Sequence, residues 1–135
     1  FAGLPLTVSG NHRMPNLVEI AEDFTAPMAA GKLKAAADKY WATDIRSFEP
    51  AAMPLGSLSV LVGFEAARAQ QQRWTSDNRM EDVLIDGPFI TGDHFALFID
   101  MEIVRRTTGK REPFSEIAVY TVRGGKIVEQ RHFHG

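Results

Sequence analysis

The spacing of apolar residues changes once along this chain, close to Asn78, and this change constrains the fold more than any other feature of the sequence. Up to Trp74, apolar side chains recur three or four residues apart, which is the period of an amphipathic helix. From Met80 onward they alternate with polar side chains, which is the period of a β-strand, most clearly at Phe95, Leu97, Ile99, Met101 and Ile103. The sequence therefore predicts helices first and a run of strands after them.

Three helices are predicted in the first part of the chain, over residues 16–28, 32–41 and 63–74. The first begins with a capping box, in which Asn16 is the N-cap and Glu19 follows three residues later. Pro27 is expected to end or bend this helix, because proline lacks an N–H and its ring clashes with the preceding turn. Residues 44–49 are predicted to form a short strand, and residues 50–56 a loop.

Strands are predicted to follow Asn78 in close succession, over residues 80–86, 94–105, 114–122 and 126–134. The Gly87-Pro88 pair is expected to break or bulge the first of them, and Gly124-Gly125 marks a hairpin turn. Consecutive hairpins give an antiparallel sheet with the helices on one face. A twisted sheet of four to six strands curls. We therefore predict an α+β fold in which a curved antiparallel sheet and three N-terminal helices surround a central pocket.

Length and composition limit the classes of protein that this chain can belong to. A chain of 135 residues fits a single domain, which we assign to residues 16–135, with residues 1–15 as an N-terminal extension. The chain contains no cysteine, which excludes disulfides and a cysteine nucleophile and fits a cytoplasmic protein. The net charge is −2 with both signs interspersed, which argues against a nucleic-acid surface. No apolar run reaches the roughly 18 residues that a membrane span requires.

Two segments carry a resemblance to a known family. YWATDIRSFEP (residues 40–50) and EIAVYTVRGGKIVEQRHF (residues 116–133) resemble the SnoaL-like proteins, and the resemblance extends over residues 16–134. These proteins belong to the α+β superfamily of ketosteroid isomerases, polyketide cyclases and nuclear transport factor, so the resemblance implies that the curved sheet is cone-shaped. The resemblance implies a pocket for a small-molecule ligand and a homodimer formed through the outer face of the sheet. It does not imply one activity, because the superfamily contains isomerases, cyclases, hydrolases, dehydratases and proteins without catalysis.

The resemblance suggests one catalytic position and weakens one reaction. Glu49, which precedes Pro50, matches the general base of ketosteroid isomerase, although a solvated glutamate at a strand end is the alternative. The tyrosine and aspartate of that enzyme's oxyanion hole fall near Phe24 and Ala118 here. Both donors are missing, which argues against steroid isomerisation. The acidic residue of the polyketide cyclases has no position-by-position match in this chain.

The last two strands carry most of the other polar candidates. Glu116 and Tyr120 share one strand face, although a core tyrosine whose hydroxyl reaches the rim is the alternative for Tyr120. On the final strand, alternation places four side chains on one face: Val128, Gln130, His132 and His134. The family resemblance implies that this face points toward the pocket. His132 and His134 point the same way and could act as bases or bind a metal, or could simply be solvated. No third ligand stands at a recognisable spacing, so we predict no metal site.

Asp100 leaves two alternatives open, because alternation does not say which face of strand 94–105 is inside. Facing inward, it would join Glu49 and Glu116 in a carboxylate cluster. Facing outward, it would be a charge on a solvated or dimer face. Three further side chains are candidates for the apolar part of the pocket: Trp41, Met53 and Trp74.

Two functional hypotheses follow. The first is a cofactor-independent enzyme that transfers protons next to a carbonyl on a small apolar compound, with Glu49, Glu116 and His132 as its catalytic residues. Its substrate would be bound by side chains of the pocket: Trp41, Met53, Trp74, Asp100, Tyr120, Gln130 and His134. No phosphate-binding loop or nucleophile elbow suggests a nucleotide cofactor or an acyl-serine reaction. The second hypothesis is a non-catalytic ligand-binding or dimerisation module with the same pocket.

Overall fold

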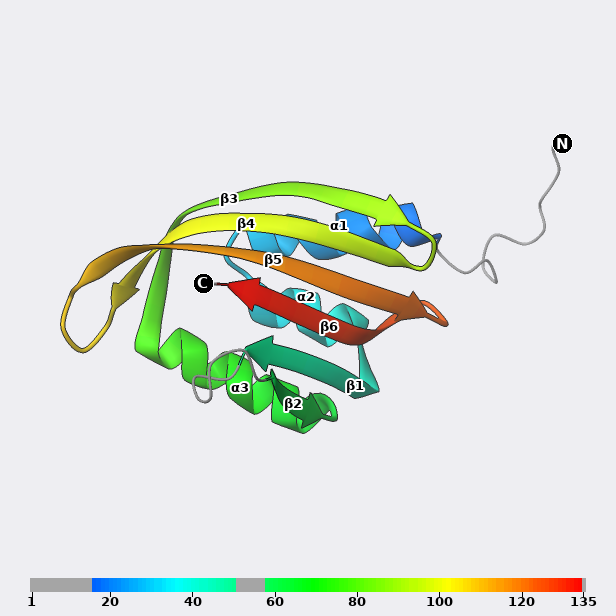
Figure 1. Ribbon diagram of the computed structural model, residues 1–135, viewed down its shortest axis with the longest axis horizontal. Helices are drawn as coiled ribbons and strands as arrows, with labels where there is room; N and C mark the ends of the chain where they lie inside the picture. Colours follow the sequence, from blue (N-terminus) through cyan, green and yellow to red (C-terminus); the bar gives the residue numbers. More distant parts are fainter. Residues whose placement is uncertain (1–15, 51–57, 135) are drawn as a thin grey trace, which may run out of the picture.

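A computed structural model describes residues 16–50 and 58–134 of the chain (Figure 1). Three helices are present in these ranges: α1 (Leu17–Ala29), α2 (Leu33–Tyr40) and α3 (Phe64–Asp77). Six strands accompany them: β1 (Trp41–Pro50), β2 (Leu58–Val62), β3 (Asn78–Thr91), β4 (His94–Arg105), β5 (Arg111–Arg123) and β6 (Lys126–His134). The expected extension over residues 1–15 and the pocket candidate Met53 lie outside the described residues.

The six strands form one open, curved sheet in the order β2-β1-β6-β5-β4-β3, and the helices lie against one of its faces (Figure 1). Neighbouring strands are antiparallel except for β1 and β6, which run parallel. This parallel pair brings the early strand that ends at Glu49 beside the last strand of the chain. The predicted α+β cone is confirmed, with the sheet mixed at this one pairing.

Helix α1 forms as its sequence predicts at the start and extends further than predicted at the end. The side-chain oxygen of Asn16 accepts a hydrogen bond from the Glu19 backbone N–H at 2.8 Å, and the Glu19 side chain accepts one from the Asn16 N–H at 3.1 Å. Pro27 lies inside the helix and does not end it. The helix ends two residues later, at Ala29, before Gly31, whose φ of 78° an L-residue with a side chain rarely adopts.

Several strand assignments differ from the predictions. Trp41 begins β1 and does not end the preceding helix. β2 was not predicted, although its LSVLV sequence is rich in residues that favour strands. β3 continues through Gly87-Pro88, and the pairing with β4 shifts register there. Of the two expectations for this pair, the break is wrong, and the shift in pairing within one long strand is what the bulge alternative describes.

A register shift near the start of β6 decides which side chains face the helices. Thr121 pairs with Glu129, but Val122 pairs with Ile127, so Val128 is an extra residue on β6. Both Ile127 and Gln130 are consequently buried on the inner face. The prediction that Val128 shares the pocket face was wrong, because one extra residue reverses the alternation at that point. From Gln130 to His134, the side chains alternate between the two faces of the sheet as predicted.

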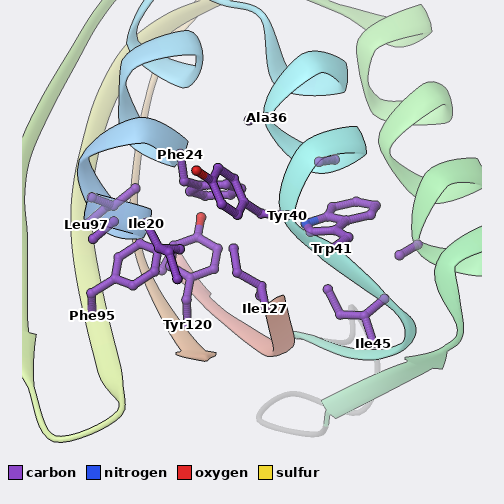
Figure 2. Packing of buried hydrophobic residues seen from close by; sticks show 14 of the residues in the cluster. Ile20, Phe24, Ala36, Tyr40, Trp41, Ile45, Phe95, Leu97, Tyr120 and Ile127 are labelled. Carbon is purple, nitrogen blue, oxygen red and sulfur yellow. The ribbon is translucent and has the colours of Figure 1, made fainter. Parts of the chain in front are cut away.

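The hydrophobic core packs between the helices and the inner face of the sheet (Figure 2). The rings of Phe95 and Tyr120 stack at 4.8 Å between centroids, and Phe24 from α1 packs edge-on against both, at 5.9 and 4.9 Å. Leu97 and Ile127 complete this layer and are fully buried. Because Phe24 and Tyr120 also line the cavity described below, the core forms its floor.

Candidate functional site

A cavity of about 320 Å³ lies between the inner face of the sheet and the three helices. This is the volume of about ten water molecules in the liquid, and it falls at the small end of ligand pockets. The cavity has an apolar side and a polar side. The apolar side is formed by side chains from the helices, β1, β3, β4 and β5: Phe24, Met28, Leu33, Ala37, Trp41, Ala67, Trp74, Met80, Val83, Ile85, Ile99, Met101 and Phe114.

The polar side is built from three neighbouring strands, β1, β6 and β5 (Figure 1). Ser47 pairs with Gln130 across β1 and β6, and Gln130 pairs with Tyr120 across β6 and β5. Further along, Glu116 pairs with His134. Because side chains two residues apart share a strand face, this register places Glu49 beside His132 on the same inner face. Residues far apart in the sequence thus form one polar surface.

Glu49 and His132 contact each other directly, through Oε2 of the carboxylate and Nδ1 of the imidazole. Their side chains are only 20% and 14% exposed, so water screens the pair weakly. Burial lowers the pKa of His132, but the bond to Glu49 and the negative charges of Glu116 and Glu49 outweigh it, and the net shift is upward. His132 is therefore held toward its charged form, with Nδ1 as the donor to Glu49 and Nε2 left for another partner.

Glu116 is the second carboxylate of the site, and its environment differs from that of Glu49. Strand β6 lies between its strand and that of Glu49, and no described residue donates a hydrogen bond to it. Burial raises the pKa of Glu116, and the charge of Glu49 raises it further, against the opposing charges of His132 and His134. A carboxyl group with a raised pKa exchanges protons closer to neutral pH than an ordinary glutamate does.

Tyr120 belongs both to the core and to the cavity wall. It is 1% exposed, its ring lies 6.4 Å from the His132 ring, and its hydroxyl is 4.0 Å from the Met28 sulfur, a weak acceptor. Burial raises the pKa of Tyr120 well above its usual range, so its hydroxyl stays protonated. Gln130 is held by a 3.1 Å hydrogen bond from its amide nitrogen to the Ser47 hydroxyl. These groups offer neutral polar contacts beside the charged ones.

The cavity brings together most of the residues that the sequence singled out. Eight candidates line it: Trp41, Glu49, Trp74, Glu116, Tyr120, Gln130, His132 and His134. Asp100 does not, because it lies on the opposite face of β4, where its carboxylate accepts a hydrogen bond from the Ser115 hydroxyl. The outward alternative for Asp100 therefore describes the structure, and the predicted cluster of three carboxylates has two members.

Several lining residues were not predicted. Ser47 could have been predicted from the alternation of side chains along a strand, since it precedes Glu49 by two residues and therefore shares its face. Gln70 and Gln71 reach the cavity from α3, and Gln71 is held by a 3.3 Å hydrogen bond to the Leu33 carbonyl. Helical spacing could have found both, since they precede the pocket candidate Trp74 by four and three residues and so share its face of the helix.

Within residues 16–50 and 58–134, no three histidine, aspartate or glutamate side chains cluster as a metal site would require. None of the described helices combines the length and apolar character needed to span a bilayer.

Comparison with known proteins identifies the family. The SnoaL-like domain family matches residues 16–134. A Mesorhizobium loti protein, provisionally called a SnoaL-like polyketide cyclase with carbohydrate phosphatase as a second description, is 36% identical, with a TM-score of 0.79 over 88% of this chain and 99% of that chain.

Two more distant structures agree in fold alone. A Bacillus subtilis protein provisionally called an isomerase is 19% identical, with a TM-score of 0.68 and 90% of each chain covered. A Catenulispora acidiphila protein with a ketosteroid isomerase-like fold, solved with trimethylamine, is 16% identical, with a TM-score of 0.64 over 90% of this chain and 86% of that chain. The search of curated proteins found no match. The family match and the agreement in fold together establish that this chain belongs to the SnoaL-like domain family.

Proposed function

We propose that this protein is an enzyme that moves a proton at a carbon next to a carbonyl group, on a small and largely apolar compound, without a cofactor. The observation that carries the proposal is the contrast between the two carboxylates. Glu49 is engaged by His132, whereas no described residue donates a hydrogen bond to Glu116 and its pKa is raised by burial. A carboxylate that could act as a base and a positively charged donor therefore line one cavity, opposite its apolar side.

In the proposed reaction, Glu116 removes a proton from the carbon next to the carbonyl. The electron pair left on carbon moves to the carbonyl oxygen, and His132 stabilises the resulting enolate by donating a hydrogen bond from Nε2. Glu116 then returns the proton to another carbon of the same system, which gives an isomer with no net gain or loss of atoms. Stabilisation of a developing oxyanion is often the largest single contribution to such a reaction.

This assignment changes the role expected for Glu49. The family resemblance makes it the base, but its contact with His132 supports a positioning role, in which Glu49 fixes the imidazole tautomer and favours the imidazolium. His132 then supplies the positive charge that takes the place of the oxyanion donors, since Phe24 and Ala118 occupy the positions expected for those.

The proposal is tested with cyclohex-3-enone, whose conversion to the conjugated enone is followed by ultraviolet absorbance. We expect turnover by the wild type and a loss of kcat of about 10²–10⁴-fold in Glu116→Gln, the usual effect of losing a general base. Binding of phenol, which mimics the enolate, should survive this substitution. Glu65→Gln is the matched control, because Glu65 is exposed on α3 away from the cavity. Equal turnover in Glu116→Gln and wild type would remove Glu116 from the mechanism.

The alternative is a ligand-binding module of the same fold. The positions of Phe24 and Ala118 favour it, because neither side chain can donate a hydrogen bond to an oxyanion. It predicts that cyclohexenones and phenol bind to the wild type in calorimetry and that no unconjugated enone is isomerised. Turnover abolished by Glu116→Gln would exclude it.

We further propose a homodimer formed through the outer face of the sheet. Phe98, Ile117 and Phe133 are in register across β4, β5 and β6, and their side chains are 38%, 47% and 48% exposed. A contiguous exposed apolar row of this kind is typical of an interface. Light scattering should give twice the chain mass for the wild type and a lower mass for Ile117→Lys. A wild type that is monomeric at all concentrations would contradict the proposal.

A further inference from the structure

His134 lies at the edge of the cavity, next to the carboxylate that the proposed reaction uses. Its side chain lines the cavity and is also exposed to solvent. It pairs in register with Glu116 across β6 and β5. Residues directly opposite each other in an antiparallel pair have Cβ atoms about 4.5–5.5 Å apart, so the imidazole and the carboxylate are within reach of each other.

Aromatic contacts hold the imidazole of His134 at this position. The ring of Phe114 lies 5.3 Å from the His134 ring, and the ring of Trp74 lies 6.0 Å from that of Phe114. All three side chains line the cavity, and they connect helix α3 with strand β6. Because Phe114 precedes Glu116 by two residues on the same strand face, its contact with His134 keeps the imidazole beside that carboxylate.

The other titratable groups of the described cavity wall are poorly placed to exchange protons with water. Tyr120 is 1% exposed. Glu49 and His132 contact each other and are 20% and 14% exposed. Glu116 is itself only partly exposed. Among the titratable side chains that the structure places on this wall, His134 is the one that both lines the cavity and is exposed to solvent.

We propose that His134 is a proton relay between Glu116 and solvent, an inference that rests on the proposed function of the cavity. The protonated carboxyl group of Glu116 gives its proton to the neutral imidazole of His134, and the imidazolium releases the proton to water. The reverse sequence reloads Glu116. No other bond forms or breaks, and no electrons are transferred to or from the protein. A proton taken from the substrate is therefore partly lost to solvent before it can return to the product.

The relay is tested with cyclohex-3-enone carrying two deuterium atoms at C2, in ordinary water. In the wild type, most of the deuterium taken by Glu116 should be lost to water before it reaches C4 of the product. In His134→Gln, the ratio of retained to lost deuterium should rise at least about tenfold, because removal of a positioned proton-transfer group slows its step by about 10²–10⁴-fold. His94→Gln is the matched control, since His94 is exposed, contacts Asp93 and lies off this cavity.

The outcomes separate the relay from the proposed function. Turnover by His134→Gln with an unchanged deuterium ratio would overturn the relay, even if kcat fell, because a structural role alone changes rate without changing the partition of the label. If the wild type does not turn over the enone, the proposed function is contradicted. The relay is then tested by a measurement that needs no substrate.

That measurement is an NMR titration of the Glu116 carboxyl carbon. The groups facing Glu116 are Glu49 from β1 and His132 and His134 from β6. Burial raises the pKa of Glu116, and the charge of His134 is one of the two that oppose this shift. His134→Gln should therefore move the Glu116 midpoint upward, while His94→Gln leaves it unchanged. An unchanged midpoint in His134→Gln would show that the two side chains do not interact and would overturn the relay.

Discussion

Replacing Glu49 with glutamine should make His132 markedly less basic. The substitution preserves the length of the side chain and its carbonyl oxygen, but it removes the negative charge that contacts Nδ1 of His132. Burial, which lowers the pKa of His132, is unchanged by the substitution, and of the groups that raise this pKa only Glu116 remains.

The size of the effect follows from the geometry. An opposite charge within about 4–6 Å shifts a pKa by about 1–3 units, which corresponds to about 1.4–4 kcal/mol of interaction. The pair is at most 20% exposed, so screening by water removes little of this interaction. We therefore expect the titration midpoint of His132 to fall clearly in Glu49→Gln, because an interaction of this size is lost.

NMR titration of the histidine ring protons measures this shift. The His132 signal is assigned by its loss in His132→Gln, and Glu65→Gln controls for the loss of one negative charge elsewhere on the protein. A His132 midpoint that is the same in Glu49→Gln and in the wild type would refute the reasoning, because it would mean that Glu49 does not set the charge of the imidazole.

Three further predictions concern stability, each measured by urea denaturation. The folded-state pKa values of Glu116 and His132 lie above their ordinary values of 4.5 and 6.5, so the stability that each group contributes is complete below its ordinary value and is lost as the pH rises through its folded-state pKa. The stability of the wild type relative to Glu116→Gln should therefore fall as the pH rises above 4.5. A difference in stability that does not change with pH would contradict the raised pKa of Glu116. Leu97→Ala should cost about 2–5 kcal/mol, because Leu97 is fully buried, whereas Val62→Ala, at a side chain 64% exposed, should change stability by less than about 0.5 kcal/mol; equal effects would contradict the assigned core. Gly87→Ala should destabilise, since Gly87 has a φ of 121° and an added Cβ would lie 2.8 Å from the Ala96 carbonyl oxygen, and an unchanged midpoint would contradict this backbone conformation.

Much of the fold could be predicted because it depends on local periodicity. The change of period near Asn78 is enough to place the helices before the long strands. Alternation within β5 and β6 also grouped Glu116 with Tyr120 and His132 with His134, and all four line the cavity. These groupings needed only the rule that side chains two residues apart share a strand face.

Other features depend on pairing between distant residues, which local patterns do not contain. The Glu49–His132 contact joins residues 83 positions apart and requires the parallel pairing of β1 with β6. The extra residue at Val128 reverses the alternation at the start of β6, and nothing in its composition marks it. For Asp100, alternation predicted two faces but not which one is inside, and the packing of β4 against the helices decided it.

The central claim is that Glu116 removes a proton from a carbon next to a carbonyl while His132 stabilises the enolate. Exchange of the α-protons of cyclohexanone for deuterium in heavy water tests it most directly, because each exchange begins with that step and is completed when the proton passes to solvent and a deuteron returns to the enolate. NMR should show exchange accelerated by the wild type, and by Glu65→Gln to the same extent, and slowed by about 10²–10⁴-fold in Glu116→Gln. Exchange by Glu116→Gln at the wild-type rate, or no acceleration by the wild type above buffer, would contradict the account.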